Sequence, residues 1–369
     1  MAPAKTGKDS PFYVSGWAHV LGGLVHRHPA FWLWLSSLET SLVSTELEPV
    51  TVRSPIFITG LARSGSTLMH EIVCSHPGVA THRLKDYPMV FTPFWWRRAT
   101  AGVQPSAPRE RAHRDKMMIT TESPDAVEEM VWMAHFRRCH DPSVNNVLSA
   151  NDSNPKFETF YRNHIRKLLL AEHANRYAAK NNYDVARLGF LLRIFPDARF
   201  IVPIRAPAGH ITSLARQHQW FSDGHRQNRK ALNAMQWSGH FEFGLDRRPI
   251  NFGDAEKVRR IQEAWKAGEE VRGLAIYWDM VYDYLHRLIQ ADAAIRDATL
   301  VVRFEDTCQS PAETLRRVLN HCRLPEVESI VAQFAPSIRM PAYYKSEFST
   351  AEQDIIARET AETARLWGY

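Results

Sequence analysis

Hydrophobic and polar residues follow one another along this chain in a pattern that predicts short buried strands separated by helices. Residues 56–58 are a run of isoleucine and phenylalanine typical of a buried strand, and the apolar spacing that follows Ser66 and Thr67 predicts a helix. Further strands, again with helical segments between them, are expected at residues 79–80, just before and including Lys180, at 199–204 and at 299–302. Strands that alternate with helices favour an α/β fold with a parallel sheet, flanking helices and right-handed crossovers.

The first part of the chain predicts a helical arm. Residues 14–47 fit one or two helices that break near His28-Pro29, and their apolar positions form a broad face. Two interpretations stay open. The face packs on the rest of the protein, which we favour, or it makes peripheral membrane contact through tryptophans that neighbour a cationic segment. We therefore divide the chain into an arm of residues 1–53 and a main domain of residues 54–369.

Segments between these elements give local predictions. Residues 97–116 are basic and contain proline, which predicts a mobile loop or one that covers a substrate. Ser123 as N-cap and Pro124 at the first helical position predict the start of a helix with Glu128 and Glu129 near its positive end. We expect those two carboxylates to serve helix-start electrostatics rather than catalysis.

Two more segments are less regular. Pro203 lies inside the strand expected at 199–204, which predicts an irregular or edge position. Residues 215–254 mix polar, aromatic and glycine residues and predict a loop-rich binding surface. Residues 255–289 return to a helical pattern.

Composition narrows the class of protein. The 369 residues are 44% hydrophobic, enough for a full core, and 46 basic against 40 acidic residues give a net charge of +6. This mild excess suits an anionic ligand, and without a nucleic-acid-binding motif we expect no nucleic acid. Four scattered cysteines indicate neither a zinc site nor a disulfide framework, and a reducing compartment is expected. No signal peptide or spanning segment is recognised, which favours a cytoplasmic protein, membrane-associated at most through its arm.

The most informative motif lies between the first predicted strand and helix. Its spacing is G-x-x-x-x-G-S-T, from Gly60 to Thr67, which is a phosphate-binding loop (P-loop) with one change. A nucleoside triphosphatase has lysine where this chain has Ser66, and the cation has moved into the loop as Arg63. The backbone N–H groups of residues 64–67, at a helix N-terminus, still favour an anion such as a 5′-phosphate.

A second motif begins where the strand at 199–204 ends. Arg205 follows that strand directly, and Ser213 lies eight residues later on the next predicted helix. Ligands bind at the carboxyl edge of an open parallel sheet, so both side chains are candidates for a ligand site. A P-loop kinase would be expected to have a metal-binding carboxylate at the end of such a strand.

Together these motifs resemble the sulfotransferases that use 3′-phosphoadenosine 5′-phosphosulfate (PAPS). Residues 63–67 resemble the family pattern [K/R]-S-G-[S/T]-T, and residues 205–213 resemble R-x-P-x-x-x-x-x-S. The R-F-E-D segment at 303–306 and the Gly-Tyr ending resemble later parts of the family pattern. The resemblance covers residues 55–369, and is strongest to a bacterial branch related to tyrosylprotein and carbohydrate sulfotransferases.

The resemblance implies a role for each motif. The donor would be PAPS, with its 5′-phosphosulfate held by four loop residues and Arg63, and with its 3′-phosphate on Arg205 and Ser213. Arg63 and Lys180 would neutralise charge on the departing 5′-phosphate, and no metal is required. The four loop residues are Ser64, Gly65, Ser66 and Thr67.

The base and the acceptor are less determined. The resembling enzymes place a glutamate or a histidine in the loop after the first helix, where this chain offers Asp86 and His82. We favour Asp86 as the catalytic base, with His82 as the alternative. The acceptor would be a hydroxyl of a glycan, a glycolipid or another small molecule, and the oligomeric state stays open.

Two other functions remain as alternatives. A P-loop kinase or other nucleotide-binding protein is disfavoured by Ser66 in place of lysine and by Arg205 in place of a carboxylate. A non-catalytic scaffold on the same fold is disfavoured because the expected donor-binding residues are all present.

Overall fold

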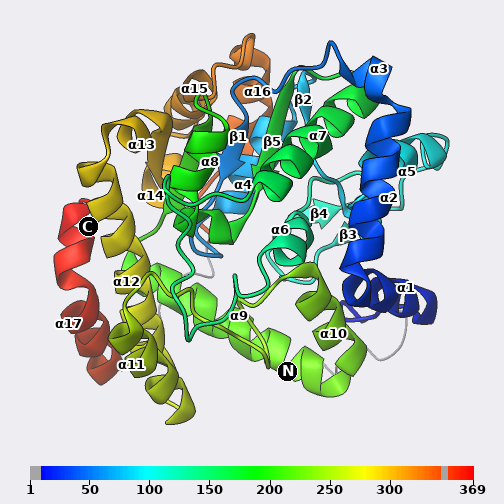
Figure 1. The fold of residues 1–369 in the computed structure, drawn as a ribbon. Helices are drawn as coiled ribbons and strands as arrows, with labels where there is room; N and C mark the ends of the chain where they lie inside the picture. Colours follow the sequence, from blue (N-terminus) through cyan, green and yellow to red (C-terminus); the bar gives the residue numbers. More distant parts are fainter. Residues whose placement is uncertain (1–9, 342–347) are drawn as a thin grey trace.

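A parallel sheet of five short strands lies at the centre of the molecule, in the computed structural model that describes residues 10–341 and 348–369 (Figure 1). The strand order is β2-β5-β1-β6-β7, and every neighbouring pair is parallel. The strands are β1 (Ile56–Ile58), β2 (Val79–Ala80), β5 (Arg176–Lys180), β6 (Arg199–Ile204) and β7 (Thr299–Arg303), and a separate antiparallel hairpin contains β3 (Arg109–Glu110) and β4 (Met118–Ile119). The predicted α/β fold with a parallel sheet is confirmed.

Helices flank this sheet (Figure 1). The helices before β6 are α1 (Gly16–Arg27), α2 (Pro29–Leu42), α3 (Ser44–Leu47), α4 (Ser66–Cys74), α5 (Pro93–Ala99), α6 (Glu129–His135), α7 (Pro155–Glu172) and α8 (Leu188–Ile194). Those after β6 are α9 (Pro207–Gln227), α10 (Arg229–Ser238), α11 (Ala255–Lys266), α12 (Glu270–Ala291), α13 (Ala293–Ala298), α14 (Phe304–Gln309), α15 (Pro311–His321), α16 (Val327–Phe334) and α17 (Thr350–Leu366). Residues 1–9 of the predicted arm and 342–347 of the predicted main domain lie outside the described residues.

Successive residues of β1 point to opposite faces of the sheet and join two cores. Phe57 packs with Phe200 and with buried residues of α7 and α8. Ile56 and Ile58 pack with Ile72 of α4 and with buried residues of α15. Because a strand buried on both faces has no polar side, β1 reads as a continuous apolar run. The sheet is therefore the middle of three layers, and the P-loop leaves its carboxyl edge.

The edge position predicted from Pro203 is wrong, because β6 lies between β1 and β7. Thr59 donates its N–H to the carbonyl of Ile201, so Ile201 faces β1. Pro203, two residues later, faces the same side. By that point β1 has ended and the chain has turned at Gly60, so no ladder hydrogen bond is lost to the proline.

Two helix predictions also differ from the structure. The helix expected to start at Ser123 and Pro124 begins at Glu129, because residues 123–125 instead pair with residues 82–84 in an antiparallel contact. Residues 215–238, expected to be loop-rich, belong to α9 and α10. Helix α9 continues through Gln227 because its apolar residues pack against α12 and the chain before α1, support that local composition does not reveal.

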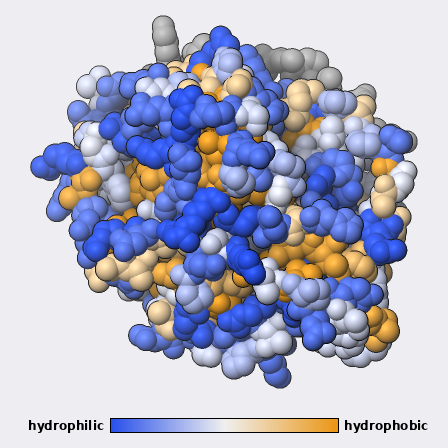
Figure 2. All heavy atoms as spheres, turned by 90° about the horizontal axis from the view of Figure 1, so that it is seen from above, coloured by the Kyte–Doolittle hydropathy of each residue, from blue (hydrophilic) through white to orange (hydrophobic). Residues whose placement is uncertain are grey.

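The arm packs closely on the rest of the chain. Val25 of α1 and Trp32 of α2 are buried in the same core as Phe57. Glu39 of α2 and Lys167 of α7 form a fully buried ion pair with a 2.7 Å contact between Oε2 and Nζ. None of the described helices has the length and apolarity needed to cross a bilayer. On the face drawn in Figure 2, hydrophilic side chains cover much of the surface and separate several hydrophobic areas.

Candidate active site

The P-loop turns at two glycines with backbone conformations that other residues rarely adopt. Gly60 and Gly65 have φ angles of 125° and 107°. A side-chain Cβ on Gly65 would lie 3.2 Å from the ring of Phe304, so the loop also needs glycine for space. Helix α4 begins at the next residue, Ser66, and the N–H groups of its first turn have no partner within the helix. The turn therefore presents backbone donors and a partial positive charge to an anion.

Arg63 connects the P-loop with the second predicted motif. Its backbone adopts a left-handed conformation with φ of 71°, which is uncommon for a residue other than glycine. The guanidinium donates from Nε to Oγ of Ser213 at 3.2 Å and from Nη1 to Oδ2 of Asp115 at 2.8 Å. Arg63 and Ser213, which lie 150 positions apart in the chain, are thus in direct contact.

The segment between β3 and β4 lies against the P-loop. Arg111 donates from Nη1 to the hydroxyl of Thr67 at 3.2 Å, and Asp115 accepts hydrogen bonds from both Arg111 and Arg63. Burial acts to raise the pKa of Asp115, but the two guanidinium groups outweigh it and hold that pKa well below its usual range. A carboxylate therefore already neutralises the loop cation. Residues 97–116, predicted to be a loop over the substrate, supply these contacts from this hairpin.

Lys180 ends β5 next to the P-loop. Its neighbour across the sheet is Ile58, the last residue of β1, so the two segments leave the sheet at the same edge. Burial lowers the pKa of Lys180, and Arg111 and Arg63 act in the same direction, while Glu242 opposes them. The lysine is thus a partly desolvated cation beside the loop.

A cavity of about 360 Å³ opens at this edge. One wall carries Arg63, Ser66, Thr67 and Lys180. The rest of the lining includes an apolar group, namely Pro11, Leu84, Ile119, Pro124, Phe221, Met235 and Phe243. Ser64, predicted with the loop residues, is buried behind this wall. The cavity therefore combines cations that suit an anion with apolar side chains, the usual composition of a small-molecule site.

A second cavity of about 280 Å³ shares Arg63 with the first. Ser213 lines it together with Arg216 and Arg114, and Arg114 lies 3.2 Å above the ring of Trp220. Arg205 is 2% exposed and stacks on the ring of Phe304, at the back of the P-loop, and it is not among the lining residues of either cavity. The predicted partners Arg205 and Ser213 thus differ in their access to the second cavity.

Asp86 and His82 form a buried network outside the first cavity. Asp86 accepts hydrogen bonds from Arg97 at 2.8 and 2.6 Å and from the N–H of Arg83 at 2.9 Å. The His82 ring bonds Asp86 through Nδ1 at 3.0 Å and His164 through Nε2 at 2.8 Å. Burial acts to raise the pKa of Asp86, but His82 and Arg97 outweigh it and bring the pKa to about 2.

Two titratable residues that the sequence did not single out do line the first cavity. Glu242 accepts a hydrogen bond from Nδ2 of Asn182 at 2.6 Å, and its other oxygen lies 3.5 Å from Nδ1 of His240. Burial acts to lower the pKa of His240, but Glu242 raises it above the usual value. The sequence contains one signal that could have indicated this pair, the H-x-E spacing of His240 and Glu242. Side chains two residues apart in an extended segment point to the same side of the backbone.

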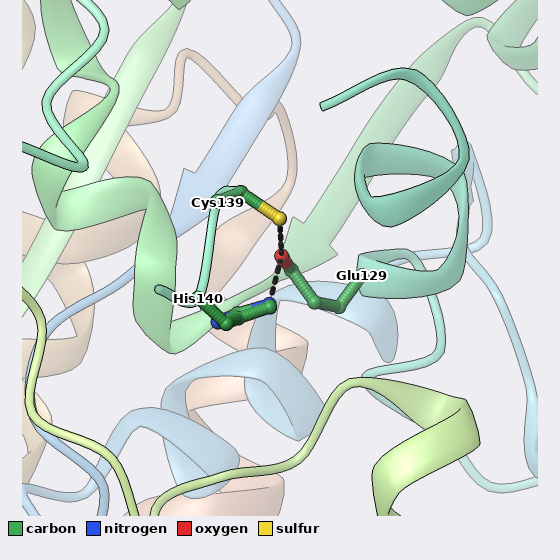
Figure 3. A group of neighbouring side chains, drawn as sticks. All are labelled: Glu129, Cys139 and His140. Carbon is green, nitrogen blue, oxygen red and sulfur yellow. Dashed lines mark hydrogen bonds and ion pairs between the residues drawn. The ribbon is translucent and has the colours of Figure 1, made fainter. Parts of the chain in front are cut away.

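Among the described residues, one group has ligand atoms close enough together to hold a metal ion. It consists of Glu129, Cys139 and His140 (Figure 3). Glu129 is already bound by both terminal nitrogens of Arg187, at 2.7 and 2.8 Å. Burial raises the pKa of the Cys139 thiol to about 12. A cation here would displace Arg187, so we interpret the group as structural. Glu129 is thus a buried ion-pair partner, beyond the helix-start role predicted for it.

A model of the Sulfotransferase family matches residues 55–254, which contain the P-loop, Lys180, Arg205 and Ser213. Sulfotransferase STF9 from Mycobacterium avium is 13% identical, with 88% of this chain and 81% of that chain covered and a TM-score of 0.48. Sulfotransferase STF1 from Mycobacterium tuberculosis H37Rv is 13% identical, with 94% and 99% covered and a TM-score of 0.44. The sulfotransferase domain of the Synechococcus PCC 7002 olefin synthase is 14% identical, with 87% and 97% covered and a TM-score of 0.36. No curated protein matches the chain.

Proposed function

The chain belongs to the sulfotransferase family, a family of PAPS-dependent enzymes, and from this premise we propose that it transfers a sulfuryl group from PAPS to an acceptor hydroxyl held in the first cavity. One observation carries the proposal. A P-loop without the triphosphatase lysine, a loop arginine and the strand-end Lys180 line one cavity together with several apolar side chains. The cations suit a phosphosulfate, and the apolar side chains suit an organic acceptor.

The donor would span both cavities. The N–H groups from Gly65 to Thr67, at the start of α4, would hold its 5′-phosphosulfate. Arg63 lines both cavities, so the 3′-phosphate would lie in the second cavity near Ser213, with Arg114 and Arg216 as further cations. Arg205, the residue predicted to bind this 3′-phosphate, would contribute its positive charge from behind the P-loop.

In the transfer step, the acceptor oxygen forms a bond to sulfur while the bond from sulfur to the bridging oxygen breaks. Adenosine 3′,5′-bisphosphate leaves with the electron pair of that bond. We assign Arg63 and Lys180 to stabilise the charge that develops on its 5′-phosphate. Both cations are held by the fold, Lys180 by β5 and Arg63 by its contacts with Ser213 and Asp115, so little reorganisation is needed when charge develops.

The acceptor proton needs a base in the cavity, and we propose His240. Its Nδ1 faces Glu242, which stabilises the imidazolium that forms, and leaves Nε2 as the nitrogen for the acceptor. Asp86 and His82, the bases expected from the sequence, would need to leave their buried partners first. His70 also lines the cavity, but burial lowers its pKa to about 3, which makes it a weak base.

The acceptor would carry its hydroxyl on a partly apolar molecule. Phe221, Met235 and Phe243 line the same cavity as the P-loop cations. Of the acceptor classes considered from the sequence, a glycolipid or another amphipathic small molecule fits this lining better than a purely polar glycan does.

A binding experiment tests the donor assignment. Thermal unfolding is followed without magnesium in adenosine 3′,5′-bisphosphate, ADP or ATP, for the wild type and for Arg63→Ala, Arg205→Ala and Arg216→Ala. We expect a selective upward shift with the bisphosphate and roughly tenfold weaker binding in Arg63→Ala, because a charge-assisted contact is lost. Arg259→Ala is the matched control, since Arg259 is exposed on α11 and pairs only with neighbouring glutamates among the contacts described. A preference for ATP would instead support the kinase alternative.

A further inference from the structure

Helices α1 and α2 carry exposed apolar side chains in a regular pattern. Trp17, Val20 and Leu24 recur at intervals of three and four residues on α1, and the same spacing continues on α2. Trp17 is 66% exposed, Trp34 58% and Leu42 66%. The exposed side chains of this surface, which we name the arm face, are Trp17, Val20, Leu24, Phe31, Trp34, Leu38 and Leu42.

The arm face is separate from the side of each helix that packs on the protein. On α1 the buried residues are Gly22, Gly23 and Val25. On α2 they are Trp32, Ser36 and Glu39, and the Glu39 carboxylate is fixed by Lys167. The two helices are therefore held in place by one side while an apolar stripe faces outward. Packing on the main domain, the interpretation favoured from the sequence, explains the inner side only.

Charge on the arm distinguishes between partners. Arg27 supplies a positive charge at the junction of α1 and α2, which we call the cationic junction; it is exposed there between His26 and His28, and burial and Arg27 lower the pKa of His26. Between residues 14 and 42 the one acidic residue is Glu39, which is buried. A two-fold symmetric contact between two copies through this face would bring Arg27 near its own equivalent, and α1 and α2 offer no exposed carboxylate to neutralise it, since the exposed Glu46 and Glu48 lie beyond α2. An anionic surface avoids that repulsion.

We propose that the arm face docks the protein on an anionic lipid surface. Tryptophan and phenylalanine favour the level of the lipid headgroups, leucine and valine reach into the acyl boundary, and the cationic junction meets the headgroup phosphates. Because no described helix can cross a bilayer, the helices would lie in the plane of the surface. This inference goes beyond the proposed function and does not depend on it.

The start of the arm also reaches the first cavity. Pro11 lines that cavity, and the next residue, Phe12, is buried against Trp220 and Phe221 of α9. One short segment thus joins the cavity wall to the docking helices. An enzyme held at a lipid surface by this arm would meet acceptors that reside in that surface.

Vesicle flotation of the full-length protein tests the proposal. We expect it to float with vesicles in which phosphatidylglycerol replaces part of the phosphatidylcholine, and to bind pure phosphatidylcholine at least tenfold less. Combined Trp17→Ser, Trp34→Ser and Leu42→Ser substitutions should reduce binding to the anionic vesicles at least tenfold. Val103→Ser, Leu245→Ser and Leu366→Ser together form the matched control, because they remove exposed apolar residues elsewhere. Near-ultraviolet circular dichroism checks the fold of both variants.

A second measurement needs no apolar substitution. Brominated anionic lipid should quench part of the tryptophan fluorescence of the wild type, and Arg27→Gln should weaken that quenching. Binding that the three serine substitutions leave unchanged would overturn the proposal. So would a dimer that forms without lipid, measured by light scattering, and that becomes monomeric in the serine variant, since the arm face would then bind a second copy.

Discussion

Two groups of polar residues, one buried outside the first cavity and one that lines it, use similar side chains for different purposes. The closed cluster consists of His82, Asp86, Arg97 and His164, all less than 10% exposed and bonded to one another. The cavity cluster consists of Lys180, Asn182, His240 and Glu242, which line the cavity. Both contain a histidine beside a carboxylate.

The two clusters differ in the direction of the second ring nitrogen of the histidine, the one that does not face the carboxylate. In the closed cluster both ring nitrogens of His82 are bonded inside the protein, and Asp86 binds the guanidinium of Arg97. In the cavity cluster only Nδ1 of His240 faces its carboxylate. A histidine-carboxylate pair is thus a structural support when it is bonded on both sides, and can act as a base when one nitrogen faces a cavity.

The comparison predicts that His240→Ala lowers turnover roughly 10²- to 10⁴-fold with donor affinity nearly unchanged, because only the acceptor of the proton is lost. His82→Ala should not show this separation of kcat from donor binding. Initial rates with labelled PAPS, alongside binding of adenosine 3′,5′-bisphosphate, provide the measurement. If His82→Ala or Asp86→Asn shows the selective loss and His240→Ala does not, the two clusters exchange roles.

A pH profile sharpens the same prediction. A base acts in its neutral form, so turnover should rise with pH through the raised pKa of His240. Glu242→Gln removes the main cause of that increase, so the rising limb should move to lower pH. Asn182→Ala, which removes the neutral hydrogen bond to Glu242, is the control and should move it less.

Lys180→Ala should lower turnover roughly 10²- to 10³-fold, the usual loss when one preorganised charge donor is removed. Lys180→Arg keeps the charge and should recover part of the rate. Single-turnover measurements with saturating donor isolate the chemical step. A loss below about fivefold would contradict the role of Lys180 on the scale expected for such a donor.

Asp86→Asn tests the closed cluster through stability. The variant removes one of the two carboxylates that pair with the buried Arg97 guanidinium and leaves Glu172 at 2.8 Å, so we expect a loss of about 2 kcal/mol in the free energy of unfolding at pH 7. The pKa of Asp86 is depressed to about 2, so its stabilisation is present above its unfolded pKa near 4 and is lost as pH falls through 2. Urea unfolding of both proteins should therefore converge in acid. Asp141→Asn, at an exposed ion pair, is a suitable control.

Asp115→Asn should have the smallest effect, a severalfold tighter binding of adenosine 3′,5′-bisphosphate. The Asp115 carboxylate bonds Arg63 and Arg111, and an incoming phosphate competes with it for the same guanidinium groups. Isothermal titration at low salt measures the change. Weaker binding in the variant would mean that Asp115 positions Arg63 rather than competing for it.

The sequence predicted the parts of the fold that local patterns determine. The P-loop, β5 up to Lys180 and the strand before Arg205 follow from short runs with definite turn residues. The edge strand predicted from Pro203 and the helix start predicted from Ser123 were wrong because neighbours in space determine both. Strand β1 ends before it reaches the proline, and residues 82–84 pair with the segment that contains Ser123.

The site was predicted only where one motif contains it. Arg63 and Ser213 fall in separate motifs, and their hydrogen bond cannot be read from either one. His240 lies 60 positions from Lys180 in a segment without a clear pattern, and only the packing of α9 and α10 brings it to the cavity. The prediction of Asp86 as the base could not include its partner Arg97, which arrives from α5, because spacing alone does not indicate that contact.

The buried pair of Glu39 and Lys167 bears on how this protein can be divided. A chain that began after residue 53 would leave the Lys167 ammonium inside α7 without its carboxylate, at a cost of about 3 to 5 kcal/mol. Much of the stability of an ordinary domain is of that size. The arm and the main domain should therefore unfold in one cooperative transition, and a truncated enzyme made for crystallisation or for a fusion protein should begin before α1.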